Sequence, residues 1–413
     1  MAPAPNIAVN RERLWESLMA MAKIGATAKG GSKRLALTDL DKEGRDLFRR
    51  WCEEAGCTVT VDRMGNIFAR RRGRRPDLAP VLTGSHLDTQ PTGGRFDGVY
   101  GVLAGLEVIR SLNDLGYETD APLEVVVWTN EEGARFAPAM VASGVFAGVF
   151  TEEYAHARTD TDGKTLGEEL KRIGYFGEAR CGGRPIAAYF EAHIEQGPIL
   201  EAEGKTIGVV QGIQGITWLD LRLAGSESHA GTTPMNRRRD ALLGCARLVE
   251  RINAIALAHP PGVATVGVVA IGPGSRNTVP GSAFFTVDLR HPEGDALAAM
   301  RARLEDEVAE VSAALGLAAE CTEIWHSAPI HFDAGAVAAV RRAAETAGYP
   351  HRDITSGAGH DAGNICKVAP TAMIFVPCAG GISHNEVESA TPEDLAAGCT
   401  VLLHAMLERA AAA

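Results

Sequence analysis

Histidine and carboxylate side chains recur where short apolar segments of this chain end. The first of them, His86, Asp88 and Asp97, lie in the stretch 82–98, which reads LTGSHLDTQPTGGRFDG. An apolar run precedes this stretch, and the segment VYGVLAGLEVIRSL that follows has its apolar residues at helical spacing. The pattern predicts a strand, a loop and a helix, with the three side chains at the carboxyl end of the strand. Ligands usually bind at that end in open α/β sheets.

His86 and Asp88 are two residues apart, so on a strand they would point to the same side. One of them could bind a metal while the other holds its ring. Each residue also has an ordinary interpretation. His-x-Asp arises often by chance, and Asp97 beside Gly98 could serve only as a turn residue.

Two adjacent glutamates close the next apolar segment. Residues 122–129, PLEVVVWT, are typical of a buried strand, and Glu131 and Glu132 follow it directly after Asn130. Glutamate pairs on a surface are common and usually idle, but charges that end an apolar strand are costly to desolvate. A metal would stabilise one carboxylate, and the other could act as general base on a water activated by that metal.

Two histidines complete the set of candidate ligands. His193 lies in the apolar segment YFEAHIEQG, and taken alone it is more often a buried, hydrogen-bonded histidine than a ligand. His384 follows another apolar run, 372–377, after two glycines that let the backbone approach a neighbour closely. Nitrogen and oxygen donors without cysteine suit zinc, and also manganese, cobalt or nickel.

Composition limits the class of protein. With 413 residues, two or three domains are expected, and 46% hydrophobic residues suffice for a large core. The net charge of −11 does not favour a general nucleic-acid surface. Eight scattered cysteines fit reduced thiols in a cytoplasmic protein. Neither a signal peptide nor a membrane span is expected from the sequence.

Residues 212–327 show a pattern of their own. Strand-like and helix-like segments alternate there in the order βαββαβ, which predicts a four-stranded, ferredoxin-like sheet with two helices on one face. The flanking segments together predict an α/β domain. The expected organisation is therefore a catalytic domain in two parts, 1–211 and 328–413, interrupted by an inserted domain at 212–327.

Several motifs occur in a recognisable order: GSHLDT, GGRFDGVYGV, TNEEGARF, HIEQGPILE, SHAGTTPM, GPGSRNTVPG, SGAGHDA and GGISHNE. They resemble the hydantoinase/carbamoylase branch of the M20 metallo-amidohydrolases over essentially the whole chain. That branch includes N-carbamoyl-L-amino-acid hydrolases, β-ureidopropionases and allantoate amidohydrolases. HIEQGP is specific to the branch, because it places a histidine where many M20 peptidases carry an acidic ligand.

The resemblance implies two divalent metal ions in each subunit. One ion would be held by His86, Asp97 and His193. The other would be held by Asp97, Glu132 and His384. Asp97 would thus bridge two ions about 3.5–4 Å apart, as in two-metal hydrolases generally.

The resemblance also implies catalytic and substrate-binding residues. Asp88 would orient His86, and Glu131 would take a proton from water and return it to the leaving nitrogen. His229 would reach the active site of a partner subunit, so a homodimer is implied, with the inserted domain as lid and dimerisation domain. The positions that match substrate contacts are Gln196, His229, Asn277, Arg290 and Gly359.

The chemistry of a ureido group agrees with these roles. Two nitrogens donate into its carbonyl, so hydrolysis needs a Lewis acid and a hydroxide available at neutral pH, which metals supply. His229 and Asn277 are plausible donors to an oxyanion. Arg290 offers two donors to a substrate carboxylate, although a strand arginine paired with a surface acid is an equal alternative.

The expected reaction converts an N-carbamoyl amino acid and water to an amino acid, ammonia and carbon dioxide. An allantoate or ureidoglycine amidohydrolase and an M20 aminoacylase or peptidase are the alternatives. A metal-holding module without catalysis is disfavoured, because Glu131 is present. His360 and Asp361 stay open between support of the metal ligands and a structural turn. Neither nucleic acid nor membrane is an expected partner.

Overall fold

The computed structural model describes residues 7–411, which form two compact units. Unit 1 comprises Met1–Gly212 and Phe332–Ala413, and unit 2 comprises Ile213–His331. The sequence places the return crossing near Ser327, whereas the chain enters unit 1 again at Phe332. The predicted α/β class with two domains is confirmed.

Four parallel strands form the centre of unit 1, in the order β4-β3-β5-β16. They are β3 (Val81–His86), β4 (Leu123–Trp128), β5 (Ala188–Ile194) and β16 (Thr371–Val376). Every residue of these strands is buried. A parallel sheet buried on both faces requires continuous apolar runs, which explains why these segments show no alternation.

Antiparallel strands extend the sheet at both sides. β2 (Ile67–Arg71) pairs with β4, and β1 (Thr58–Val61) pairs with β2. On the other side β6 (Ile207–Ile213) pairs with β16. β14 (Ile330–His331) and β15 (His351–Ser356) complete the sheet beside β6.

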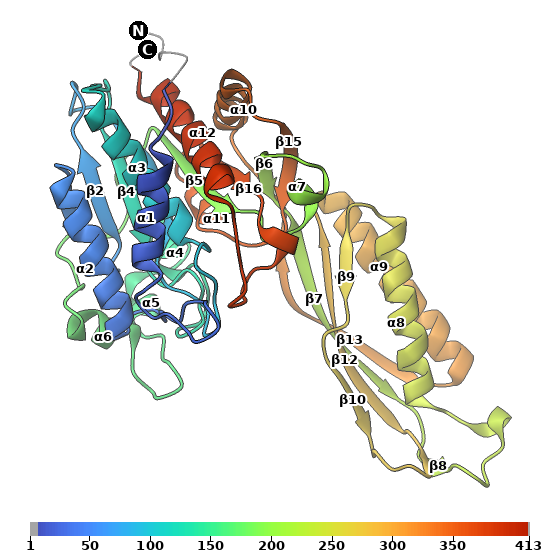
Figure 1. Ribbon diagram of the computed structural model, residues 1–413. Coiled ribbons are helices and arrows are strands. Elements are labelled where there is room, and N and C mark those ends of the chain that lie inside the picture. Colours follow the sequence, from blue (N-terminus) through green and yellow to red (C-terminus); the bar gives the residue numbers. More distant parts are fainter. Residues whose placement is uncertain (1–6, 412–413) are drawn as a thin grey trace. The chain divides into compact units, whose positions relative to one another are not determined.

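Helices cover the buried strands (Figure 1). α3 (Val99–Asp114) packs on β3 and β5, and α12 (Pro392–Ala410) packs on β5 and β16. The Tyr100 hydroxyl donates to the Leu395 carbonyl at 2.8 Å and joins these two helices. The other helices of unit 1 are α1 (Arg11–Met21), α2 (Asp39–Glu54), α4 (Val141–Phe146), α5 (Glu152–His156), α6 (Leu166–Arg172), α7 (Ile199–Ala202), α10 (Ala334–Ala347), α11 (Ala362–Ile365) and the 3-10 turn η2 (Ala379–Gly381).

Unit 2 is an antiparallel sheet in the order β10-β12-β7-β13, with α8 and α9 on one face (Figure 1). This strand order and the βαββαβ sequence confirm the ferredoxin-like prediction. The elements are β7 (Gly215–Ala224), β8 (Ser228–His229), η1 (Met235–Arg237), α8 (Ala241–Ala258), β9 (Val263–Thr265), β10 (Val269–Gly272), β11 (Thr278–Val279), β12 (Ser282–His291), α9 (Gly294–Leu315) and β13 (Ala318–Ser327).

Residues 263–272 of unit 2 form two short strands instead of one continuous strand. β9 and β10 each pair with a different part of β12, and Gly267 lies in the irregular step between them. Glycine inside a strand commonly marks such a break. The Val268 amide compensates by donating to the Thr286 hydroxyl at 3.2 Å.

Among the helices of residues 7–411, none combines the length and the apolar character needed to cross a bilayer.

Candidate active site

The parallel strands of unit 1 bring the predicted residues to one edge of the sheet. His86 ends β3, His193 lies near the end of β5, and Glu131 follows β4 closely. β3 lies between β4 and β5, so the chain connects to opposite sides of it in succession. Ligands in open α/β folds bind at such a switch point, which explains the concentration of polar groups there.

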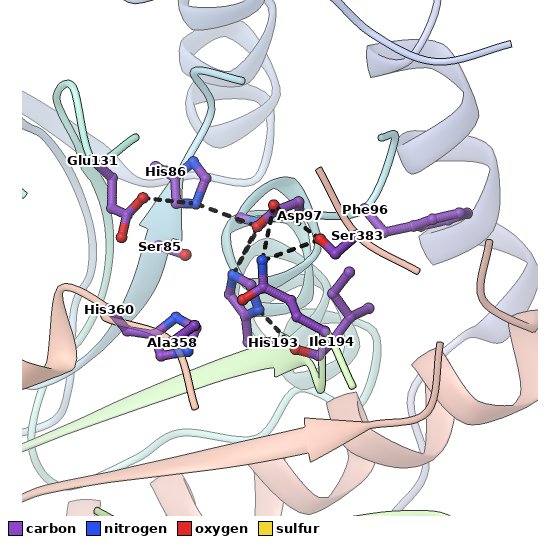
Figure 2. Close-up of polar contacts among 12 residues, drawn as sticks. Ser85, His86, Phe96, Asp97, Glu131, His193, Ile194, Ala358, His360 and Ser383 are labelled. Atoms are coloured by element: carbon purple, nitrogen blue, oxygen red, sulfur yellow. Dashed lines mark hydrogen bonds and ion pairs between the residues drawn. The ribbon is translucent and has the colours of Figure 1, made fainter. Parts of the chain in front are cut away.

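The first group of candidate ligands contains His86, Asp97 and His193, all of them buried (Figure 2). Asp97 Oδ1 lies 3.2 Å from His193 Nε2 and 3.7 Å from His86 Nε2. Main-chain carbonyls hold the Nδ1 atoms of both rings, so both Nε2 atoms face the aspartate. Gly98 makes this approach feasible, because a Cβ there would lie 2.3 Å from the His86 ring.

The second group contains Asp97, Glu132 and His384. Asp97 Oδ2 lies 3.3 Å from His384 Nε2, and Glu132 Oε2 lies 3.6 Å from the same nitrogen. Within each group the candidate ligand atoms lie within 4.8 Å of one another. The two oxygens of Asp97 therefore face different groups, which is the arrangement that a bridging carboxylate needs.

Charges at the site perturb one another strongly. Burial lowers the pKa of His86 to about 4. Burial also acts to lower the pKa of His193, but the hydrogen bond and charge of Asp97 outweigh it and raise that pKa to about 9. Burial and the charge of Asp97 raise the pKa of Glu132 to about 8. The carboxylates thus repel one another in the absence of a cation.

Glu131 is buried beside these ligands. Its Oε2 lies 3.5 Å from His86 Nε2 (Figure 2). Burial, followed by the charges of Asp361 and Glu132, raises the pKa of Glu131 well above its ordinary value. A carboxylate with a raised pKa suits a group that must accept and return a proton near neutral pH.

Asp88 requires a correction to the predicted geometry. β3 ends at His86, so Asp88 lies beyond the strand, and the two residues are not related by strand alternation. The Asp88 main-chain carbonyl, 2.8 Å from His86 Nδ1, holds the ring. The Asp88 carboxylate instead accepts the main-chain amides of Glu131 and Glu132, each at 3.3 Å. It positions both glutamates rather than the histidine.

Two of the predicted substrate residues, Gln196 and Gly359, belong to unit 1. The Gln196 amide donates to Asp97 Oδ2 and to the Ser383 hydroxyl, both at 3.1 Å. Gly359 faces the thioether of Met140, which a Cβ on the glycine would approach to 3.0 Å. Left-handed backbone conformations at non-glycine residues cluster around this edge, at Asn130, Met140, Gln196 and His384.

The other predicted substrate residues belong to unit 2. Strand pairing sets Thr278 opposite His229, and the Ala230 amide donates to the Asn277 carbonyl at 2.9 Å, so His229 and Asn277 are neighbours. Arg290 lies on β12 and pairs with Asp288 on the same strand at 2.8 Å. The acid partner that the sequence left as an alternative for Arg290 is thus present.

Sequence reasoning missed three supporting residues. Gln90 donates its main-chain amide and its side-chain amide to the Glu132 carboxylate, at 3.1 and 2.6 Å. Ser383 and Glu388 contact the segment that carries Asp97. Gln90 lies within HLDTQ, and Ser383 and Glu388 lie within SHNEVE, so their positions indicated proximity to ligands. Residue type alone did not distinguish them from surface polar residues.

His360 and Asp361 are buried next to the ligands. The His360 ring centroid lies 4.6 Å from that of His193, and His360 Nε2 lies 3.0 Å from the Ser356 hydroxyl oxygen. Burial and the charge of Glu191 raise the pKa of Asp361 well above its ordinary value. Both residues are therefore buried beside the site, which fits support of the ligands as well as a turn that shapes the substrate pocket.

The donor set fits a pair of divalent cations. Buried carboxylates with raised pKa values face histidine nitrogens that the protein has already oriented, and one aspartate serves both groups. Cations would remove the repulsion between the carboxylates. The nitrogen and oxygen donors suit zinc or a neighbouring first-row ion.

Comparison with protein families identifies the chain. The family model "Peptidase family M20/M25/M40" matches residues 82–408, which include every candidate ligand. The chain belongs to this family. The hydrolase class predicted from the sequence is confirmed with it.

Individual relatives confirm the predicted branch. An N-carbamoyl-L-amino-acid amidohydrolase from Rhizobium meliloti is 55% identical, over 99% of each chain. The crystal structure of an amidase of the hydantoinase/carbamoylase family from Burkholderia multivorans is 66% identical, with a TM-score of 0.96 over 98% of this chain and 99% of that one. An allantoate amidohydrolase from Escherichia coli is less similar, with 32% identity over 95% of this chain and 96% of the relative.

Proposed function

We propose that this protein hydrolyses N-carbamoyl-L-amino acids to amino acid, ammonia and carbon dioxide. The observation that carries the proposal is the shared aspartate: Asp97 faces a histidine pair on one side and a glutamate and histidine on the other. The 55% identical relative bears the name of this activity. Allantoate amidohydrolase is a more distant relative and gives the second candidate function.

The proposal includes two divalent ions, of zinc, manganese, cobalt or nickel. His86, Asp97 and His193 would hold one ion. Asp97, Glu132 and His384 would hold the other. When bound, the ions supply Lewis acidity toward the ureido carbonyl and lower the pKa of water to about 7.

Glu131 is the proposed general base and acid. It is buried beside the ligands, and the Asp88 carboxylate holds its main-chain amide. In the proposed reaction Glu131 accepts a proton from the attacking water and gives it to the nitrogen that leaves. Burial raises the pKa of Glu131, and a carboxylate with a raised pKa is a stronger proton acceptor.

His229 is suited to stabilise an oxyanion. Its Nδ1 accepts the main-chain amides of Gly231 and Thr232, at 3.0 and 3.2 Å. These two contacts leave the proton of the neutral ring on Nε2, which is therefore a donor. The Asn277 amide oxygen accepts the Ser275 hydroxyl at 2.9 Å, so its NH₂ group remains available as a second donor.

The remaining contacts would select the substrate. Arg290 would exchange Asp288 for the substrate carboxylate, since its guanidinium can bind a carboxylate through two donors. Gln196 and Gly359 would contact the substrate from unit 1. A small molecule with a carboxylate is thus the proposed partner, and a cytoplasmic location is part of the same proposal.

A homodimer formed through the inserted domain is also part of the proposal. Leu242, Val249 and Leu257 lie seven and eight residues apart on α8 and are exposed by 42%, 38% and 76%. β13 is a terminal strand of its sheet, and all of its residues except Ser327 are exposed. Apolar helix surface and an open strand edge are common features of subunit interfaces. In the dimer, the partner subunit's His229 would serve the site that contains Glu131.

A turnover panel tests the substrate class. Metal-reconstituted protein would be assayed with N-carbamoyl-L-amino acids, N-carbamoyl-β-alanine, allantoate and an N-acetyl amino acid. The highest kcat/KM on an N-carbamoyl-L-amino acid is expected. Preference for allantoate would establish the second candidate, and preference for the N-acetyl compound would establish an aminoacylase.

A further inference from the structure

Glu388 is a buried carboxylate that has no role in the proposed reaction. Its side chain is 1% exposed, although Val387 beside it is 59% exposed. Its Oε1 accepts the main-chain amides of Phe96 and Asp97, at 2.9 and 3.2 Å. Its Oε2 accepts the Ser383 hydroxyl at 3.0 Å.

These contacts join two segments that are distant in the sequence. Phe96 and Asp97 precede α3, whereas Ser383 and Glu388 lie between η2 and α12. Each segment carries one proposed ligand of the second metal position, namely Asp97 and His384. A single carboxylate therefore fixes the separation of these two ligands.

The packing around Glu388 shows that its position is specified closely. A Cβ on Gly94 would lie 2.1 Å from Glu388 Cδ and Oε1, so the main chain at residue 94 rests directly on the carboxylate. No side chain other than hydrogen fits there without moving Glu388. The segment before Asp97 is thus shaped around this group.

His384 needs this support more than the other histidines do. Its side chain is 53% exposed, compared with 2% for His86 and 1% for His193. It lies in a loop, and its φ of 52° is a left-handed conformation that side chains rarely adopt. Burial cannot hold this ring, so the main chain of its loop must do so.

We propose that Glu388 is a positioning residue that clamps the Asp97 and His384 segments together and thereby sets the affinity of the second metal position. The inference rests on the proposed two-metal site. The first position depends less on the clamp, because His86 and His193 are held by the sheet and only Asp97 is shared.

Metal affinity tests the clamp directly. Co²⁺ would be titrated into metal-free protein, with binding followed by visible absorption and metal content confirmed by elemental analysis. Glu388→Ala should weaken one of two binding steps by about 10–100-fold, the range for residues that support metal ligands, and weaken the other step less. In a His384→Ala background, which removes one step, Glu388→Ala should add little.

A conservative variant separates hydrogen bonding from charge. The carbonyl oxygen of Glu388→Gln can still accept the two amides, and its NH₂ can donate to Ser383, so binding should return to within about threefold of wild type if geometry is the cause. Gly94→Ala should resemble Glu388→Ala, because its methyl displaces the carboxylate. Gly94→Ala therefore tests the clamp independently if Glu388→Ala does not fold. Ser383→Ala should weaken Co²⁺ binding less than Glu388→Ala does.

Glu107→Ala is the matched control. Glu107 is also 1% exposed and joins distant segments, since it accepts the Asn10 amide and the Arg13 guanidinium. This control should lower thermal stability and leave both Co²⁺ steps unchanged. Equal effects of Glu388→Ala and Glu107→Ala on metal binding would overturn the clamp, as would a glutamine variant as weak as alanine. Absence of Co²⁺ binding by wild type would instead refute the proposed metal site.

Discussion

The sheets of the two units are buried in different ways. In unit 1 the central strands are buried at every residue, and the candidate ligands that they carry lie at or near their carboxyl ends. In unit 2, β12 alternates between buried and half-buried residues, and only the face under α8 and α9 forms the core. Among the described residues, the buried carboxylates with strongly raised pKa values, such as Glu131 and Asp361, belong to unit 1.

This difference indicates that unit 1 bears the free-energy cost of burying the charged groups that the proposed function needs. Unit 1 encloses mutually repelling carboxylates among buried apolar strands, and the hydrophobic burial of those strands offsets the cost of desolvating the carboxylates. Unit 2 has an ordinary apolar core and presents His229 and Asn277 on exposed turns and short strands. We therefore expect perturbations of unit 1 to change chemistry and perturbations of unit 2 core residues to change mainly stability.

Removal of metal should have the largest effect. Treatment with a chelator is expected to abolish turnover, because the Lewis acid is lost and the carboxylates around Asp97 then repel one another. Mn²⁺, Co²⁺, Ni²⁺ or Zn²⁺ should restore activity to different degrees, as measured by kcat after reconstitution. Full activity in exhaustively metal-free protein would contradict the two-metal interpretation.

The adjacent glutamates should respond differently to the same substitution. Glu131→Gln is expected to lower kcat by at least about 10²-fold with metal content near wild type, since it removes a proton acceptor. Glu132→Gln should instead reduce occupancy of one metal position. Elemental analysis and kcat of both variants test the assignment, and equal metal loss in the two would show that the roles are wrong.

Subunit mixing tests whether unit 2 serves a partner's site. His229→Ala and Glu131→Gln should each be nearly inactive as homodimers. A heterodimer would combine both lesions in one site and leave the other intact. Random 1:1 exchange should therefore restore about one quarter of wild-type activity, since the subunits re-sort by mass action.

The control for this mixing experiment is a direct measurement of subunit exchange, for example with differently tagged chains. If His229 serves its own subunit, each site in the heterodimer retains one lesion. Confirmed exchange without recovery would then exclude the shared site.

A core substitution in unit 2 should have the smallest effect on chemistry. Phe285 is fully buried beneath the helices of unit 2. Phe285→Ala should destabilise that unit by about 3–5 kcal/mol through lost burial and cavity formation. Calorimetry should show a lower unfolding temperature, while Co²⁺ affinity measured well below that temperature stays unchanged. A large change in metal affinity would show that the units are more strongly coupled than their separate cores indicate.

The sequence predicted the fold of unit 2, and it named the residues that the structure brings together around Asp97, for physical reasons. Alternation and helical spacing are local patterns, so the βαββαβ order is readable directly, and ligand types at the ends of apolar strands indicate one sheet edge. The carboxylate contacts of Asp88 and of Glu388 were not predictable. They depend on main-chain amides that only the fold brings near. For example, Glu388 accepts the main-chain amide of Phe96, which is 292 positions away in the sequence.

The points where the chain leaves and enters unit 1 are direct neighbours, because the Phe332 amide donates to the Gln211 carbonyl at 2.9 Å. The inserted unit thus leaves and rejoins unit 1 at neighbouring points, and a turn of a few residues could connect them with little loop entropy. All the proposed metal ligands lie on the unit 1 side of this junction. We expect the same junction to accept other inserted domains whose two termini lie close together.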